Sequence, residues 1–387
     1  MKSKKIGALL VFFVSCIPML SSAATWVDTL DSYAREKYLP ASHYMWTWID
    51  AALLNTMVKQ YDLTTDATQK QTYLAYVRKA MKVSGPLANG RMPNDVASAL
   101  GFAFLYRVTH DEKYKLKAEK IYRQYLKIKR TKEGAVSHLP VNVELWDDTV
   151  FMIGQFLLAM YQATGEQQYL DEFMKQLRLH REKLQDTQTG LWVHGWDSDH
   201  KDHCFVCGQT HWPDWTTRRS SEVWGRGNGW IVVTLADALT ITGKQNAYYN
   251  ELAGYLKEMI APLPALQDSK TGHWYQLPVR NTDPNNFIES SCTAMFAYGI
   301  EAAIRLGLVT GKEYETAVER AYHGLRDYSL EPVHDKYLIT KNVCTATCIG
   351  DKDYYLHRKV QRGKPYGIGM FIQFGLHYEL DHQLRHD

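Results

Sequence analysis

The 387-residue sequence lacks the features that usually divide a chain into several domains. No stretch rich in proline, glycine and serine interrupts it, and it has no block of like charge and no low-complexity segment. We therefore predict a single large domain over residues 24–387. Strong net charge is also lacking. With a formal net charge of +3, the chain has no basic excess of the kind found in nucleic-acid binders, and we expect no nucleic-acid partner.

Cysteine is scarce, with six residues in all, of which five lie beyond residue 23. An odd number at irregular spacing argues against a disulfide framework. Zinc ligands are conceivable at His203, Cys204, Cys207 and His211, but no second pair at zinc-finger spacing accompanies them. We favour a local disulfide or free thiols there, leave Cys344–Cys348 as a candidate pair, and predict no metal and no cofactor.

Long apolar runs are absent except at the N-terminus. Residues 6–20 are apolar after a lysine-rich start and are followed by small residues at 21–24, which is typical of a secretory signal peptide. The run is too short for a convincing membrane span and contains Pro18. We expect residues 1–23 to be removed and the protein to be periplasmic or secreted. The alternative is a lipoprotein anchored through Cys16.

Apolar residues recur with helical period, whereas strand-like alternation is scarce and short. The predicted fold class is therefore all-α, with helices over 45–61, 96–108, 114–126, 150–163, 169–184, 231–241, 248–260, 292–306 and 314–328. Short turns followed by tyrosine recur at 108–114, 163–169, 241–248 and 309–314, which is typical of repeated helical hairpins. Six hairpins would form an (α/α)6 barrel, and a linear solenoid is the competing arrangement.

Aromatic residues are abundant, with 11 Trp and 25 Tyr. Their flat rings suit stacking on sugar faces, and a tyrosine-rich helical core is the simpler explanation.

The strongest catalytic candidate is the stretch ELWDDTVFM at 144–152, where a polar connection meets a nearly all-apolar helix. Asp147 and Asp148 are about 100° apart on a helix, so they cannot face the same way. We place Asp148 on the face of Met152 and Gln155, and Asp147 on the solvent side or as a cap. A carboxyl held against aromatic rings would have a raised pKa and could act as a general acid. The alternative is that both residues are ordinary helix-start acids.

Other polar residues fall in connections that would surround one mouth of a closed barrel. Asp95 also lies at a helix entrance, where it could form a carboxylate pair with Asp148 or simply cap the helix. His138 and His194 are candidate ligands for sugar hydroxyls or a carboxylate.

The stretch WGRGNGW at 224–230 is the least ordinary in the chain. If it is extended, Trp224, Arg226 and Trp230 lie on one side, and Arg226 could bind a sugar carboxylate in bidentate fashion. A purely structural glycine turn is the alternative.

Together these motifs resemble glycoside hydrolase family 105, the unsaturated rhamnogalacturonyl or rhamnoglycuronyl hydrolases, and more distantly the unsaturated glucuronyl hydrolases of family 88. The resemblance rests on residues 146–152, 189–195, 224–230 and 289–295. It implies an (α/α)6 barrel, catalysis by Asp148 assisted by Asp95, and binding of an unsaturated uronate by His138, His194, Trp224, Arg226 and Trp230. Two segments depart from the family pattern, at 364–369 and at 198–220, which includes Arg218 and Arg219.

The resemblance also implies a mechanism. Protonation at C4 of the 4,5-unsaturated uronate gives a cation at C5 that water traps, and the hydrated sugar rearranges and expels its neighbour. The substrate would be a lyase-generated oligosaccharide, rhamnose-linked, from ulvan or rhamnogalacturonan. The rival functions are a polysaccharide lyase, an ordinary inverting glycosidase and a non-catalytic glycan-binding protein.

Overall fold

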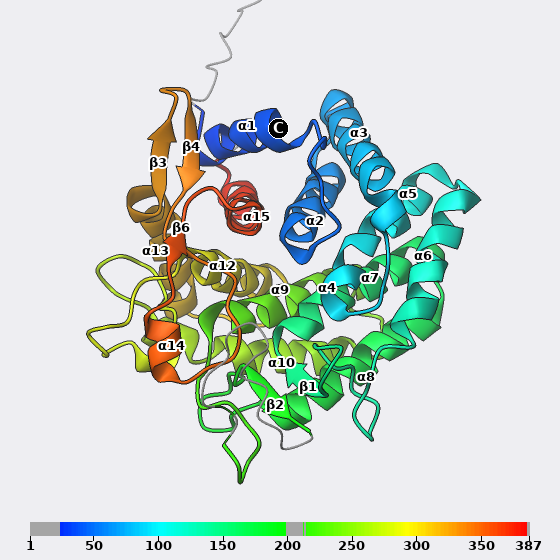
Figure 1. The fold of residues 1–387 in the computed structure, drawn as a ribbon. Helices are drawn as coiled ribbons and strands as arrows, with labels where there is room; N and C mark the ends of the chain where they lie inside the picture. The colour runs from blue at the N-terminus through cyan, green and yellow to red at the C-terminus, as the bar shows by residue number, and fades with distance from the viewer. Residues whose placement is uncertain (1–23, 199–211, 213, 385–387) are drawn as a thin grey trace, which may run out of the picture.

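The computed structural model describes residues 24–198, 212 and 214–384. Within them, an inner ring of helices surrounds the core, and each inner helix packs against the next. The last inner helix packs against the first, which closes the ring (Figure 1). The inner helices are α2 (Trp48–Leu63), α5 (Leu100–Thr109), α7 (Asp148–Thr164), α9 (Gly225–Thr242), α12 (Ser290–Arg305) and α15 (Pro365–Asp381). Closure confirms the predicted barrel and excludes the solenoid.

An outer layer completes six helix pairs in the described part of the chain. Five outer helices follow their inner partners in sequence, whereas the N-terminal helix covers the C-terminal one. The outer helices are α1 (Trp26–Tyr38), α3 (Ala67–Ser84), α6 (Glu112–Tyr125), α8 (Gln167–Leu184), α10 (Tyr249–Ile260) and α13 (Lys312–Tyr328). No helix of the described residues is long and apolar enough to cross a membrane.

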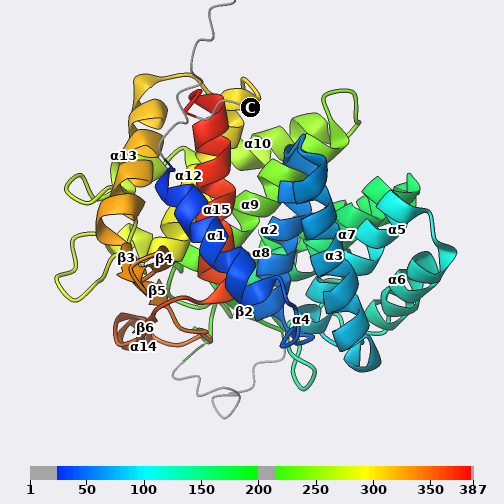
Figure 2. The same cartoon turned by 90° about the horizontal axis from the view of Figure 1, so that it is seen from above.

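Long connections gather at one end of the barrel (Figure 2). They contain three two-stranded antiparallel sheets and a few short helices among the described residues. These elements are β1 (Glu144–Trp146) with β2 (Gly195–Asp197), β3 (Leu330–Val333) with β4 (Tyr337–Thr340), β5 (Val343–Cys344) with β6 (Val360–Gln361), α4 (Pro93–Val96), α11 (Leu263–Leu266) and α14 (Lys352–Leu356). Every inner helix begins at this mouth, so its partly positive N-terminal end faces the same region, which favours an anionic ligand.

Residues 224–230 are not extended, because α9 begins at Gly225, so the one-sided arrangement considered for an extended segment does not occur. Glycine is a poor helix former, which is why the pattern looked non-helical. Packing explains the glycines: a side chain at Gly227 would overlap the carboxylate of Asp147. The tight approach of α9 to the start of α7 therefore outweighs the low helix propensity.

The other predicted helices are confirmed within a few residues, but α1, α3 and α15 were missed. In α15 the cause is again glycine. A Cβ atom at Gly369 would lie 2.7 Å from Thr56 Oγ1 on α2, so glycine there permits the contact that closes the ring.

Candidate active site

A cavity of about 240 Å³ opens at the mouth of the barrel. Its walls come from the first turns of inner helices and from the connections before them. The lining residues are Trp48, Asn94, His138, Leu139, Trp146, Asp148, Met152, Trp224, Arg226, Ala346, Thr347 and Cys348. Asp148 is the only carboxylate residue among these described residues.

The pairing of β1 with β2 brings the two aspartates beside His194. The Asp147 N–H donates to the His194 carbonyl at 3.0 Å. His194 Nε2 lies 3.2 Å from Asp148 Oδ2 and 3.8 Å from Asp147 Oδ1. Asp148 keeps 8% of its surface exposed at the cavity, whereas Asp147 is fully buried and its side chain caps no helix. The prediction that Asp147 faces solvent or caps the helix is therefore wrong.

Proton affinity differs sharply between the two acids. Burial and the neighbouring charge of Asp148 raise the pKa of Asp147 well above its ordinary value. Burial alone would also raise the pKa of Asp148, but the hydrogen bond and charge of His194, with His138 and Arg226, outweigh it and lower that pKa. The raised pKa expected for Asp148 thus belongs to Asp147. Of the two acids, Asp147 therefore holds a proton more strongly than Asp148.

The orientation of His194 is fixed from both sides. Burial lowers its pKa more than Asp148 raises it, so the ring is neutral at neutral pH. An ionised Asp148 can only accept, so His194 Nε2–H donates to it. Nδ1 therefore accepts from the Tyr355 hydroxyl at 2.7 Å, and burial keeps that hydroxyl protonated by raising its pKa.

His138 forms a second wall of the cavity. Its ring stacks on Trp146 with centroids 4.4 Å apart and an interplanar angle of 5°. Nδ1 lies 2.9 Å from Thr149 Oγ1, and Nε2 lies 3.4 Å from Asn94 Nδ2. Burial lowers the pKa of His138 to about 4, so it is neutral near pH 7 and offers a hydrogen bond rather than a charge.

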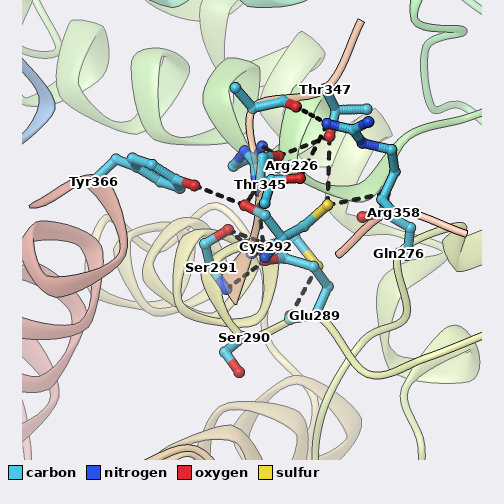
Figure 3. A network of polar contacts seen from close by, with 12 residues as sticks. Arg226, Gln276, Glu289, Ser290, Ser291, Cys292, Thr345, Thr347, Arg358 and Tyr366 are labelled. Atoms are coloured by element: carbon cyan, nitrogen blue, oxygen red, sulfur yellow. Dashed lines mark hydrogen bonds and ion pairs between the residues drawn. The ribbon is translucent and has the colours of Figure 1, made fainter. Parts of the chain in front are cut away.

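Arg226 lines the cavity but is fully buried, and both of its terminal nitrogens donate hydrogen bonds within the protein (Figure 3). Nη1 donates to the Cys344 carbonyl at 2.8 Å, and Nη2 donates to the Thr345 carbonyl at 2.7 Å. Its charge is balanced by Glu289 at 3.7 Å, while Nε has no partner among the described residues. Arg226 therefore supplies positive charge to the cavity and also anchors the loop over it.

Of the two tryptophans predicted to bind the sugar, Trp224 lines the cavity and Trp230 does not. Trp224 lines the cavity and packs against His194, with ring centroids 4.4 Å apart. Trp230 does not line it, because it is buried against Phe151 at 4.2 Å. Trp48 takes the lining position and was missed, because it carries no motif and opens an otherwise ordinary apolar helix.

The sequence around this cavity is similar to that of known proteins. The family model described as Glycosyl Hydrolase Family 88 matches residues 21–380. This chain belongs to that family. It is a glycoside hydrolase, and the resemblance found from the sequence motifs is confirmed.

This hydrolase is similar to several known glycoside hydrolases. The chain is 25% identical over 342 residues to the unsaturated rhamnogalacturonyl hydrolase YesR of Bacillus subtilis, covering 86% of this chain and 89% of that protein. It is 25% identical over 185 residues to the unsaturated 3S-rhamnoglycuronyl hydrolase of Formosa agariphila, covering 47% of this chain and 46% of that protein. A family 105 glycoside hydrolase from C. acetobutylicum has the same fold, with a TM-score of 0.79, 22% identity and coverage of 92% of this chain and 100% of that one.

The structure does not bring Asp95 into the cavity of this hydrolase. Asp95 lines a neighbouring, more open depression, where burial raises its pKa to about 6. The preceding residue, Asn94, faces the cavity instead. A one-residue change at a helix entrance turns a side chain by about 100°, which the sequence pattern did not resolve.

Several polar features of the sequence prove structural or lie elsewhere. Arg219 donates to the Leu184 and Gln185 carbonyls, and Arg218 donates to the Ser198 carbonyl. The zinc candidates His203, Cys204, Cys207 and His211 lie outside the described residues.

The structure decides the state of Cys344 and Cys348, which the sequence left open, and they do not form a pair. Cys344 is a free, buried thiol, whereas Cys348 is disulfide-bonded.

Among the described residues, one cluster has ligand atoms close enough to hold a metal ion: Asp147, Asp148 and His194 lie within 4.8 Å of one another. The short distances in the cluster have another explanation, because His194 donates a hydrogen bond to Asp148 and the Asp147 N–H donates to the His194 carbonyl. The absence of a metal stays a prediction, and the comparison of activity with and without EDTA, described below, would test it.

We expect Tyr355→Phe to lower kcat about tenfold with little change in KM. Loss of the hydroxyl leaves a buried nitrogen of His194 without its donor and frees the ring to adopt the other tautomer, at a cost of about 1–3 kcal/mol. Steady-state kinetics would measure it. Tyr248→Phe, which removes an exposed hydrogen bond to Asp171, is the matched control and should behave as wild type. Unchanged kcat in Tyr355→Phe would contradict the orienting role.

Proposed function

We propose that this glycoside hydrolase removes the 4,5-unsaturated uronate from the non-reducing end of lyase-generated, rhamnose-linked oligosaccharides by hydrating its double bond. The carrying observation is that Asp148 is the one carboxylate residue on the described wall of the cavity. Ordinary glycosidases need two carboxyl groups, about 5–9.5 Å apart on either side of the sugar. Hydration of an enol ether needs a single acid that gives a proton and then takes one back. The names of the relatives support the same substrate class.

Charge in the cavity supports an acidic sugar. Arg226 lies within the wall, and the N-terminal ends of the inner helices converge on the mouth. The arriving uronate carboxylate adds negative charge beside Asp148. A like charge raises the pKa of a carboxyl group, so binding moves the proton of the aspartate pair onto the member that faces the sugar.

Asp148 then donates this proton to C4, and the electron pair of the C4–C5 double bond forms the new C–H bond. Water adds to the resulting cation at C5 and gives its proton to the Asp148 carboxylate, which restores the acid. The hemiketal at C5 opens by breaking the C5–O5 bond. The hemiacetal left at C1 then expels the neighbouring sugar as an alcohol. One water molecule is consumed, and no covalent bond to the protein is required.

The direct test follows the ultraviolet absorbance of the unsaturated uronate in a panel of lyase-generated disaccharides. This reaction removes the chromophore, a lyase creates it, and an ordinary glycosidase leaves it unchanged. A glycan-binding protein would bind without any change. We expect the absorbance to fall at the same rate with and without EDTA. Activity lost in EDTA and restored by a metal ion would contradict the metal-free mechanism.

Asp148→Asn should lower kcat by about 10²–10⁴ while substrate still binds, because the amide keeps the shape but cannot donate the proton. At low pH Asp147→Asn should cost much less, because Asp147 does not line the cavity and asparagine resembles its protonated form. Its activity should fall at a lower pH than that of the wild type, because Asp148 must then take its proton from solvent. In the wild type, activity should fall as the pH rises through the raised pKa of the aspartate pair, because the pair then loses its only proton. Kinetics on both variants across pH decide this. An inactive Asp147→Asn with a near-normal Asp148→Asn would reverse the assignment.

We also propose that the protein is exported. The N-terminal pattern of residues 1–23 supports this, and so does the disulfide at Cys348, because disulfides persist mainly in oxidising compartments. Cell fractionation followed by mass spectrometry should find a chain beginning near Ala24 outside the cytoplasm. A lipid-modified chain beginning at Cys16 would support the anchored alternative, and an intact chain in the cytoplasm would contradict export.

A further inference from the structure

A basic depression adjoins the cavity and has no part in the chemistry above. It reaches about 670 Å³, within the range of about 300–1,000 Å³ typical of small-molecule sites. Consecutive residues line the two spaces: Asn94 faces the cavity and Asp95 the depression, and Leu139 faces the cavity and Pro140 the depression. The depression therefore opens directly beside the place where the unsaturated sugar would lie.

Two smaller hollows extend this depression along α6, and shared lining residues connect them. Gln124 lines all three hollows, Arg91 and Lys120 each line two, and Lys127 links the outer two. We call the set Arg91, Lys120 and Lys127 the basic rim. All three side chains are exposed, and none forms an ion pair within the described residues.

The balance of charge in the depression is positive. Arg123 also lines its outer part, but Glu119 neutralises it at 3.7 Å. Asp95 is the one carboxylate among the lining residues. The positive charge of Arg91 partly offsets the rise in the pKa of Asp95 that burial causes. Three unpaired cations around one concave surface attract an anion and focus its approach. Arginine and lysine are also the side chains that bind sulfate and carboxylate groups in water.

We propose that the basic rim binds a sulfate ester or a carboxylate on the sugars that follow the unsaturated uronate. The depression is then the subsite for the leaving part of the oligosaccharide, and this inference rests on the proposed function. Arg218 and Arg219, in the segment that departs from the family pattern, suit this role less well, because each guanidinium group already donates to backbone carbonyls and neither lines the depression.

The test compares the wild type with the triple variant Arg91→Ala, Lys120→Ala, Lys127→Ala. The substrates are an unsaturated disaccharide with a sulfate on its second sugar, the same disaccharide after desulfation, and an unsaturated oligosaccharide with a further uronate. Each exposed charge pair changes binding by a factor of about two to five, so the triple variant should raise KM for an anionic substrate about tenfold or more. kcat should stay the same, as should KM for the desulfated disaccharide.

Lys244→Ala is the matched control, because Lys244 is equally exposed but lies in a short turn at the opposite end of the barrel. Added salt should raise the wild-type KM for the anionic substrates and leave the triple variant almost unaffected. A response to the sulfated substrate alone identifies sulfate as the ligand, and a response to the additional uronate alone identifies carboxylate.

An equal change of KM for charged and uncharged substrates, or no change at all, would overturn the subsite. Failure of the wild type to hydrolyse any unsaturated substrate would instead overturn the proposed function. The two failures are therefore distinguishable in one experiment.

Discussion

A single buried positive charge holds the mouth of the barrel together. Removing the guanidinium group of Arg226 from water is costly unless its charge and its N–H groups find partners. Glu289 supplies the charge, and the Cys344 and Thr345 carbonyls accept two hydrogen bonds. Glu289 also caps α12 and accepts from the Cys344 N–H. One ion pair thus fixes the first turns of two inner helices and the loop that covers the cavity.

The cost of burying charge also determines the arrangement of Asp147 and Asp148. Because α7 begins directly after β1, adjacent acids enter a buried space together, and two negative charges cannot be accommodated there. Their surroundings differ. The Asp148 carboxylate meets His194 at the cavity, whereas the Asp147 carboxyl group lies against Gly227 at the start of α9, away from the cavity. The positions of the two residues therefore give one carboxyl group that ionises readily at the cavity, Asp148, and one that holds a proton strongly, Asp147.

Most of the barrel was predictable because each helical hairpin shows apolar residues at helical period and a similar short turn, and both are local features of the sequence. The exceptions are instructive. Residues 224–230 and 365–375 are rich in glycine, which lowers helix propensity. The structure shows that these glycines serve helix contacts, at Gly227 against Asp147 and at Gly369 against Thr56. Such contacts join distant segments, so no local pattern could reveal them.

By itself the sequence determined the helical class, the number of hairpins and the family, because periodicity and ordered motifs are properties of neighbouring residues. It also singled out Asp148, His138 and Arg226, which all line the cavity. Only the tertiary structure decided which acid has the raised pKa, that Asn94 rather than Asp95 enters the cavity, and that Trp48 rather than Trp230 lines it. Burial, side-chain direction and charge balance depend on what packs across the barrel, and that information is absent from any single stretch of chain.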